Sequence, residues 1–216
     1  GETEAEFAET LSLVDAVGAM LSDLERELLV AAGRLGMPNL RKLVAMGANR
    51  RFVVRLHGAG LLGVGKVTLG GARWEPEGPD QRLLIGVCDG GELVDVVAVS
   101  STCRDEWSLR TGLGWALGAD AIDEVHKVLA SDMGEKKKRV RLRLHATPFD
   151  WLAAGGEGLC VLDWCAASLA ELRGLGERVT LQVPPGGAER IKGLLAYGGL
   201  PRVSDGADGF MGRIAA

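Results

Sequence analysis

The chain has 216 residues, 47% of them hydrophobic, and is long enough for one large domain or two small ones. A formal net charge of −4 argues against nucleic-acid binding through overall charge, and no apolar run approaches the roughly 20 residues that span a bilayer. The first residues are acidic, whereas a secretion signal would be basic. We therefore expect a soluble, cytoplasmic protein that has no membrane partner.

Charge is strongly segregated along the chain. Residues 1–27 contain eight acidic side chains and one basic side chain, Arg26. Residues 34–57, here called the first basic block, contain no acidic residue and carry Arg34, Arg41, Lys42, Arg50, Arg51 and Arg55. Residues 136–143, the second basic block, carry Lys136, Lys137, Lys138, Arg139, Arg141 and Arg143. Each block could bind a polyanion locally although the net charge of the whole chain is negative.

The N-terminal segment has the pattern of one long helix. Apolar residues at helical spacing predict a helix from about residue 4 to residue 32, and they are Phe7, Leu11, Val14, Leu21, Leu24 and Leu28. Such a helix could cover the protein core or pair with a protein partner, and both interpretations stay open.

The middle of the chain is predicted to form strands. Asn39 can cap a short helix over 40–46, and strand-like segments follow at 52–56, 62–69, 82–87 and 93–99. Asp89-Gly90-Gly91-Glu92 is a strong hairpin signal, so we expect an antiparallel meander. Gly60 to Lys66 superficially matches a phosphate-binding loop, but Val67 replaces the magnesium-binding Ser or Thr and no helix pattern follows, which excludes that motif.

Two helices are predicted, over residues 105–117 and 119–129, and a strand pattern follows them. In residues 139–144 apolar and basic side chains alternate, which predicts a half-buried strand with a basic face. Thr147-Pro148 then opens a short helix that continues through Leu152. The strand at 139–144 is expected to lie parallel to the strands that follow.

The segment from Gly158 to Tyr197 reads as strand, helix, strand, helix. Apolar runs at 159–162 and 179–183 are predicted to pair in parallel, with helices at 166–172 and from 188. Pairing would bring Asp163 and Trp164 next to Gly186 and Gly187 at the helix start, forming a candidate anion or nucleotide site. Alternatively, Asp163 caps a helix and the Pro-Gly pair only turns the chain.

This succession, a strand ending in an acidic residue, a small-residue helix, a second strand and a Pro-Gly-Gly loop, resembles half of a Toprim domain. The preceding segment GGELVDVVAVSSTCRDEWSLRTGLGWALG is similar to segments of phage and prophage primase-like proteins. A Toprim site holds magnesium through a glutamate and an Asp-x-Asp pair. Here Asp163 takes the first place and no Asp-x-Asp follows. We therefore expect no cofactor, Mg²⁺ being the ion that such a fold would hold.

The predicted fold is α+β, with a long N-terminal helix and an antiparallel meander followed by a small parallel Toprim-like or Rossmann-like unit. The expected domains are an acidic helix over 1–36, the meander with its helical pair over 37–134, and the α/β unit over 135–216.

No catalytic constellation is apparent. The three histidines lie in separate segments, and the four cysteines, Cys88, Cys103, Cys160 and Cys165, lack zinc-ligand spacing and are expected to be reduced thiols. A Cys–His pair assembled by folding stays open, but we do not expect an enzyme or a metal site.

Three functions are consistent with these patterns. The first is a non-catalytic, primase-like accessory protein of phage type that binds DNA or RNA. The candidate contacts are Arg41, Lys42, Arg50, Arg51, Arg55, Lys136, Lys137, Lys138, Arg139, Arg141 and Arg143. The alternatives are a nucleotide- or metal-binding α/β enzyme that uses Asp163 and the 184–187 loop, and an interaction module that recruits a protein through the N-terminal helix.

Overall fold

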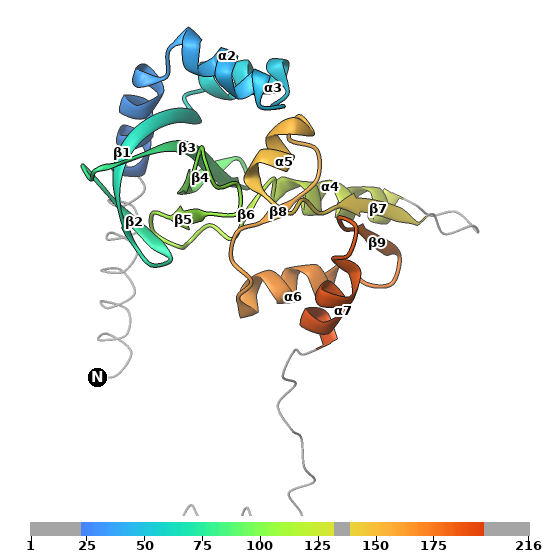
Figure 1. Cartoon of the computed structure of the whole chain (residues 1–216). Helices are drawn as coiled ribbons and strands as arrows, with labels where there is room; N and C mark the ends of the chain where they lie inside the picture. The colour runs from blue at the N-terminus through green and yellow to red at the C-terminus, as the bar shows by residue number, and fades with distance from the viewer. Residues whose placement is uncertain (1–22, 132–138, 197–216) are drawn as a thin grey trace, which may run out of the picture.

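A computed structural model describes residues 23–131 and 139–196 of the chain (Figure 1). Helices and strands are mixed, which confirms the predicted α+β class. Residues 23–34 are helical. The other helices are α2 (Met37–Ala45), α3 (Arg50–Gly58), α4 (Asp120–Ser131), α5 (Pro148–Ala153), α6 (Ala166–Gly174) and α7 (Ala188–Ala196). The strands are β1 (Leu62–Gly70), β2 (Arg73–Pro76), β3 (Asp80–Asp89), β4 (Glu92–Val99), β5 (Trp107–Leu109), β6 (Ala116–Leu117), β7 (Val140–Arg143), β8 (Cys160–Val161) and β9 (Val179–Gln182).

Strands β1 to β5 close into a barrel in the order β1-β2-β5-β4-β3. The predicted hairpin is confirmed, because β3 and β4 pair in antiparallel fashion around Gly90 and Gly91, whose φ angles of 58° and 84° suit glycine in a tight turn. The sequence did not predict closure, which requires the short parallel pairing of Arg73 with Leu109. The segment that superficially matches a phosphate-binding loop, Gly60 to Val67, runs into strand β1. No helix follows it, whereas that motif would require one.

Both faces of β3 and β4 are covered, which explains their continuous apolar runs. Leu83, Ile85 and Val97 belong to one core cluster with α2, α3 and α5. The neighbouring residues, among them Leu84 and Val96, point to a second cluster with helix 23–34. The described part of the acidic helix therefore covers the core, through Leu24, Leu28 and Ala31.

Two predicted elements were wrong. Residues 52–56 belong to helix α3, because Asn49 caps it and Phe52, Val53 and Leu56 bury one helical face. The helix predicted over 105–117 is strand β5, a loop and strand β6. Gly112 in this loop has a φ angle of 76°, which no right-handed helix contains.

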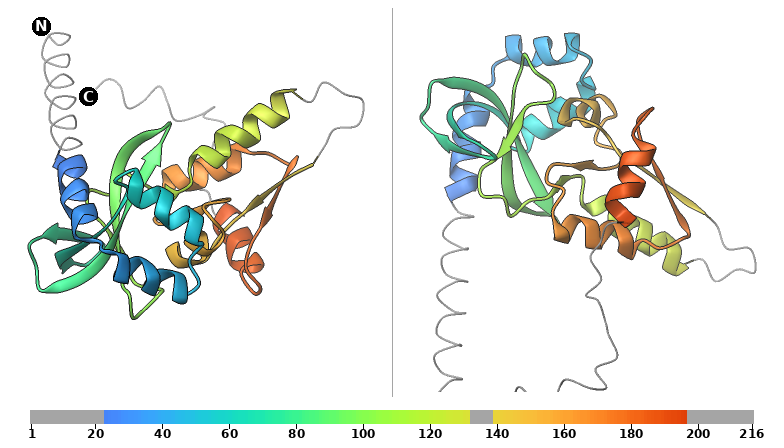
Figure 2. Two further views of the ribbon diagram at one scale, coloured as in Figure 1. Left: turned by 90° about the horizontal axis from the view of Figure 1, so that it is seen from above. Right: turned by 60° about the horizontal axis from the view of Figure 1, so that its bottom comes forward.

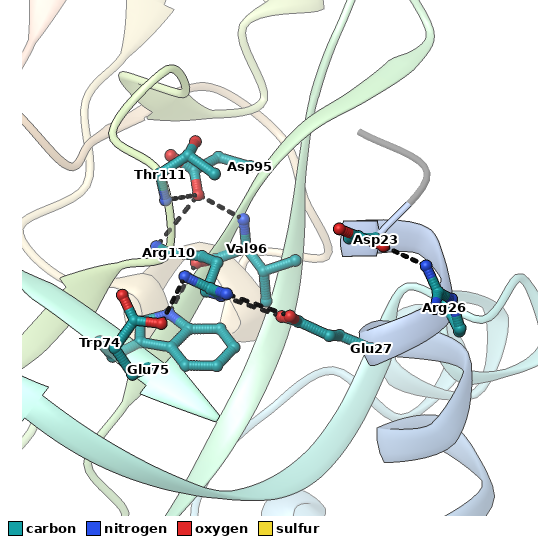
Figure 3. Close-up of polar contacts among 9 residues, drawn as sticks. All are labelled: Asp23, Arg26, Glu27, Trp74, Glu75, Asp95, Val96, Arg110 and Thr111. Carbon is teal, nitrogen blue, oxygen red and sulfur yellow. Dashed lines mark hydrogen bonds and ion pairs between the residues drawn. The ribbon is translucent and has the colours of Figure 1, made fainter. Parts of the chain in front are cut away.

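The carboxylate of Asp95 explains the loop conformation (Figure 3). Asp95 is fully buried. Its two oxygens accept hydrogen bonds of 2.6–3.1 Å from the backbone N–H groups of Val96, Arg110, Thr111, Gly112 and Gly114. These N–H groups cannot take part in a helix while they converge on one side chain.

Arg110 connects this loop to two other elements (Figure 3). Its guanidinium donates two hydrogen bonds to Glu27 of helix 23–34, at 3.0 and 3.2 Å, and pairs with Glu75 of β2 at 2.9 Å. It also lies 5.5 Å from the ring centroid of Trp74. Hydrogen bonding to the Glu27 carboxylate is the main cause of the raised pKa of Arg110.

The C-terminal strands form a smaller arrangement. The strand predicted at 139–144 is confirmed as β7, parallel to β9. The predicted pairing of β8 with β9 is wrong, because Leu144 bridges Leu159 and β7 therefore lies between them. The expected Toprim-like half depended on that pairing. Strand β8 instead pairs with β6 in antiparallel fashion, and Figure 2 shows α4 beside β7.

The described residues contain three apolar clusters, two of which were introduced above. The third joins α4, β7, α6 and β9. Helix α4 and strand β7 therefore share a core across residue 134, and the domain boundaries stay a prediction. Within the described ranges, no helix is both long and apolar enough to cross a membrane.

The Asp95 contacts lead to a stability prediction. Asp95→Asn replaces one acceptor oxygen with an amide that faces N–H donors, so it should lower the free energy of unfolding by about 3–5 kcal/mol in chemical denaturation. The control is Asp105→Asn, since Asp105 is exposed. Equal, small changes in both variants would show that Asp95 does not hold the loop.

Candidate nucleic-acid interface

Most of the first basic block forms helices α2 and α3, and Arg34 is the last residue of helix 23–34. Leu40 and Leu43 of α2, and Phe52, Val53 and Leu56 of α3, are buried. The opposite faces carry five exposed cations, Arg41, Lys42, Arg50, Arg51 and Arg55. Amphipathic packing therefore leaves the basic residues in solvent.

The turn between the helices is short and well defined. It comprises Met46, Gly47, Ala48 and Asn49. Gly47 has a φ angle of 105°, and Asn49 accepts a 3.1 Å hydrogen bond from Phe52 N–H. The backbone N–H of Asn49 also donates to Leu152 O at 3.0 Å, which ties the turn to α5. Asn49 was not among the predicted site residues, although Asn before a short apolar period is an N-cap signal.

The cations of α2 and α3 are not neutralised locally. Among the described residues, none of the five forms an ion pair. The first turn of α3 has no acidic residue and carries Arg50 and Arg51 at the positive end of the helix dipole. The Arg55 guanidinium lies 5.1 Å from the ring centroid of Phe52. The surface is therefore electropositive and available to an anion.

The second basic block lies partly on β7. Leu142 is buried, while Arg139, Arg141 and Arg143 are exposed, so the predicted alternation is confirmed. Lys136, Lys137 and Lys138 lie outside the described residues.

The two blocks border one cavity of about 650 Å³. Phe52 and Leu56 of α3 line one part of it, and Arg141 and Arg143 of β7 line another. Three acidic residues also line this cavity, namely Asp120, Glu124 and Glu157. The cavity thus joins the apolar face of α3 to two arginines of β7, while the cations of α2 and α3 do not line it.

The predicted ligand site around Asp163 has a different arrangement from the one expected. With β7 between β8 and β9, Asp163 and Trp164 do not follow a strand adjacent to β9. Gly186 has a φ angle of 82°, and Gly187 N–H donates to Pro184 O at 3.0 Å. Pro184 to Gly187 therefore forms a tight turn that uses this N–H group.

Asp163 lies just before helix α6 but does not cap it. It is exposed, and the N-cap of α6 is Cys165, with no side-chain capping bond. Trp164 is half-buried and packs against the cluster that contains β7 and α6. The capping alternative for Asp163 is therefore wrong.

The described cysteines and histidines form no nucleophilic pair. His57 and His145 contact the backbone oxygens of Ala32 and Glu157. Burial, with a smaller effect of Asp150, raises the pKa of the Cys160 thiol to about 12, so it is protonated at neutral pH. Within residues 23–131 and 139–196, no group of three or more His, Cys, Asp or Glu side chains is placed to hold a metal ion.

Comparisons with known proteins gave no relatives: no family model matches the chain, and neither the curated proteins nor the solved structures include a significant match. The function must therefore be inferred from the chemistry of this chain alone.

The Cys160 thiol leads to a prediction about pH. Its folded-state pKa is above the roughly 8.5 of a free thiol, so its contribution to stability is present below that pH and decreases as the pH rises toward 12. In denaturation measured between pH 8 and 10.5, Cys160→Ala should lose less stability with rising pH than wild type, by up to about 1.4 kcal/mol per pH unit. The exposed Cys103→Ala variant should follow wild type. Parallel curves for all three proteins would contradict the raised pKa.

Proposed function

We propose that this chain binds nucleic acid through the exposed cations of α2 and α3, as a non-catalytic accessory protein of the primase-like type. The observation that carries the proposal is the set of five exposed cations without an ion pair among the described residues. Phosphate groups of a nucleic acid would supply the missing counter-charges.

The position of two arginines favours a ligand over simple solvation. A cation in the first turn of a helix opposes the dipole, and the unfavourable effect is about 0.3–1 kcal/mol per residue. Arg50 and Arg51 both occupy the first turn of α3. Residues that oppose local stability without a structural partner are typical of functional surfaces.

The arginines of β7 extend the proposed contact. Arg141 and Arg143 reach the cavity beneath α3, where a strand of nucleic acid crossing from α3 would meet them. Asp120, Glu124 and Glu157 oppose phosphate there, so we assign the principal contact to α2 and α3.

The test is a charge reversal on α3. The triple variant Arg50→Glu, Arg51→Glu, Arg55→Glu should lose salt-sensitive binding of DNA, measured by fluorescence anisotropy. The slope of log K against log salt should become shallower by about 0.9 for each of these arginines that contacts a phosphate. The melting temperature should change little, because glutamate suits positions 50 and 51 in the first turn of α3 but opposes the helix dipole at position 55 in the last turn.

A matched control keeps the same change in net charge. The variant Lys127→Glu, Arg190→Glu, Lys192→Glu reverses three exposed cations on α4 and α7. It should retain most of the affinity. Equal losses in the two triple variants would mean that only net charge matters, and unaltered binding in the α3 variant would remove α3 from the interface.

A further inference from the structure

Helix α2, the turn and helix α3 have the dimensions of a helix–turn–helix unit. Each helix has nine residues, and four residues join them, with a left-handed glycine at position 47. Helix–turn–helix units join two helices by a turn of about three or four residues, often with glycine, and place the second helix in the DNA major groove. Figure 1 shows α2 and α3 together on one side of the barrel.

The outer face of α3 is a narrow stripe. Arg51, Val54, Arg55 and Gly58 recur at helical spacing and are all exposed, Val54 at 51%. An added Cβ at Gly58 would meet no atom within 4 Å, so the end of the stripe is open. The stripe combines two cations with an apolar side chain and contains no carboxylate.

A hollow of about 320 Å³ lies between the two helices. Arg41 of α2 and Arg50 of α3 line it, together with Met37, Val44 and Val54. A sugar–phosphate backbone that passed over this hollow would meet a guanidinium from each helix. The hollow borders the α3 stripe through Val54, so backbone and groove contacts can form together.

The size of α3 selects one form of nucleic acid. A helix is about 10–12 Å wide, and the major groove of B-form DNA is about 12 Å wide. Nine residues extend for about 13.5 Å, or roughly four base pairs. The major groove of A-form RNA is too deep and narrow for side chains to read, and a single strand has no groove.

We infer that α3 enters the major groove of double-stranded DNA, an inference that rests on the proposed function. Arg51 and Arg55 face the base edges, where a guanidinium can pair with guanine O6 and N7, and Val54 faces thymine methyl groups. Arg41 and Arg50 hold the flanking phosphates.

The first experiment compares nucleic acids of one sequence at one salt concentration. Fluorescence anisotropy with the full chain should show that duplex DNA binds at least about tenfold more tightly than the single strand or the RNA duplex. A DNA duplex whose cytosines carry bulky 5-substituents, which fill the major groove, should lose a similar factor.

The second experiment adds bulk to the stripe without changing its charge. Val54→Trp should weaken duplex binding at least about tenfold and leave single-strand binding unaltered. Val30→Trp is the matched control, because Val30 is 50% exposed on helix 23–34. Both variants should melt at the wild-type temperature.

The outcomes separate this inference from the proposed function. Equal, salt-sensitive binding of duplex DNA, single-stranded DNA and duplex RNA would overturn major-groove insertion and keep the proposed function. Major-groove insertion would also be overturned if Val54→Trp bound duplex DNA with wild-type affinity, or if the protein bound the duplex with 5-substituted cytosines as tightly as the unmodified duplex. No binding to any of the three would overturn both.

Discussion

A buried carboxylate is stable only when hydrogen-bond donors surround it, and Asp95 accepts hydrogen bonds from five backbone N–H groups. Those bonds bend the chain after β5 and orient Arg110 toward Glu27 and Glu75. Arg110 in turn fastens helix 23–34 to the barrel. Two residues separate this helix from α2, and α2 and α3 are positioned further by their packing on the cluster that contains Ile85 and Val97.

Local patterns were sufficient where one dominant signal was present. The Asp89–Glu92 turn, the alternation in β7 and the Thr147-Pro148 helix start each depend on nearby residues, and each was predicted correctly. The segment Phe52–Leu56 was wrongly predicted as a strand because it contains two adjacent β-branched residues, Val53 and Val54, which are typical of strands. Residues 105–117 were wrongly predicted as a helix because the carboxylate of Asp95, which lies outside this segment, accepts the hydrogen bonds of backbone N–H groups that a helix would need.

The candidate interface was partly accessible from sequence. Segregated charge identified the cations of α2 and α3, and amphipathic spacing explains why they are exposed. The turn geometry was not predicted, although Asn49 caps α3 and Gly47 has a positive φ angle, because the 52–56 segment has the composition of a strand. The strand order β8, β7, β9 was also missed, since the spatial order of parallel strands depends on crossovers that local patterns do not specify.

The carboxylates around the shared cavity have a consequence for any long polyanion. Asp120, Glu124 and Glu157 line the cavity that both basic blocks border, so a continuous track of positive charge does not run from α3 to β7 there. A polyanion bound on α3 as proposed would be repelled at this point, so each protein molecule would cover only a short length of it. Such a surface would favour binding of separate molecules at individual sites over cooperative binding along a strand.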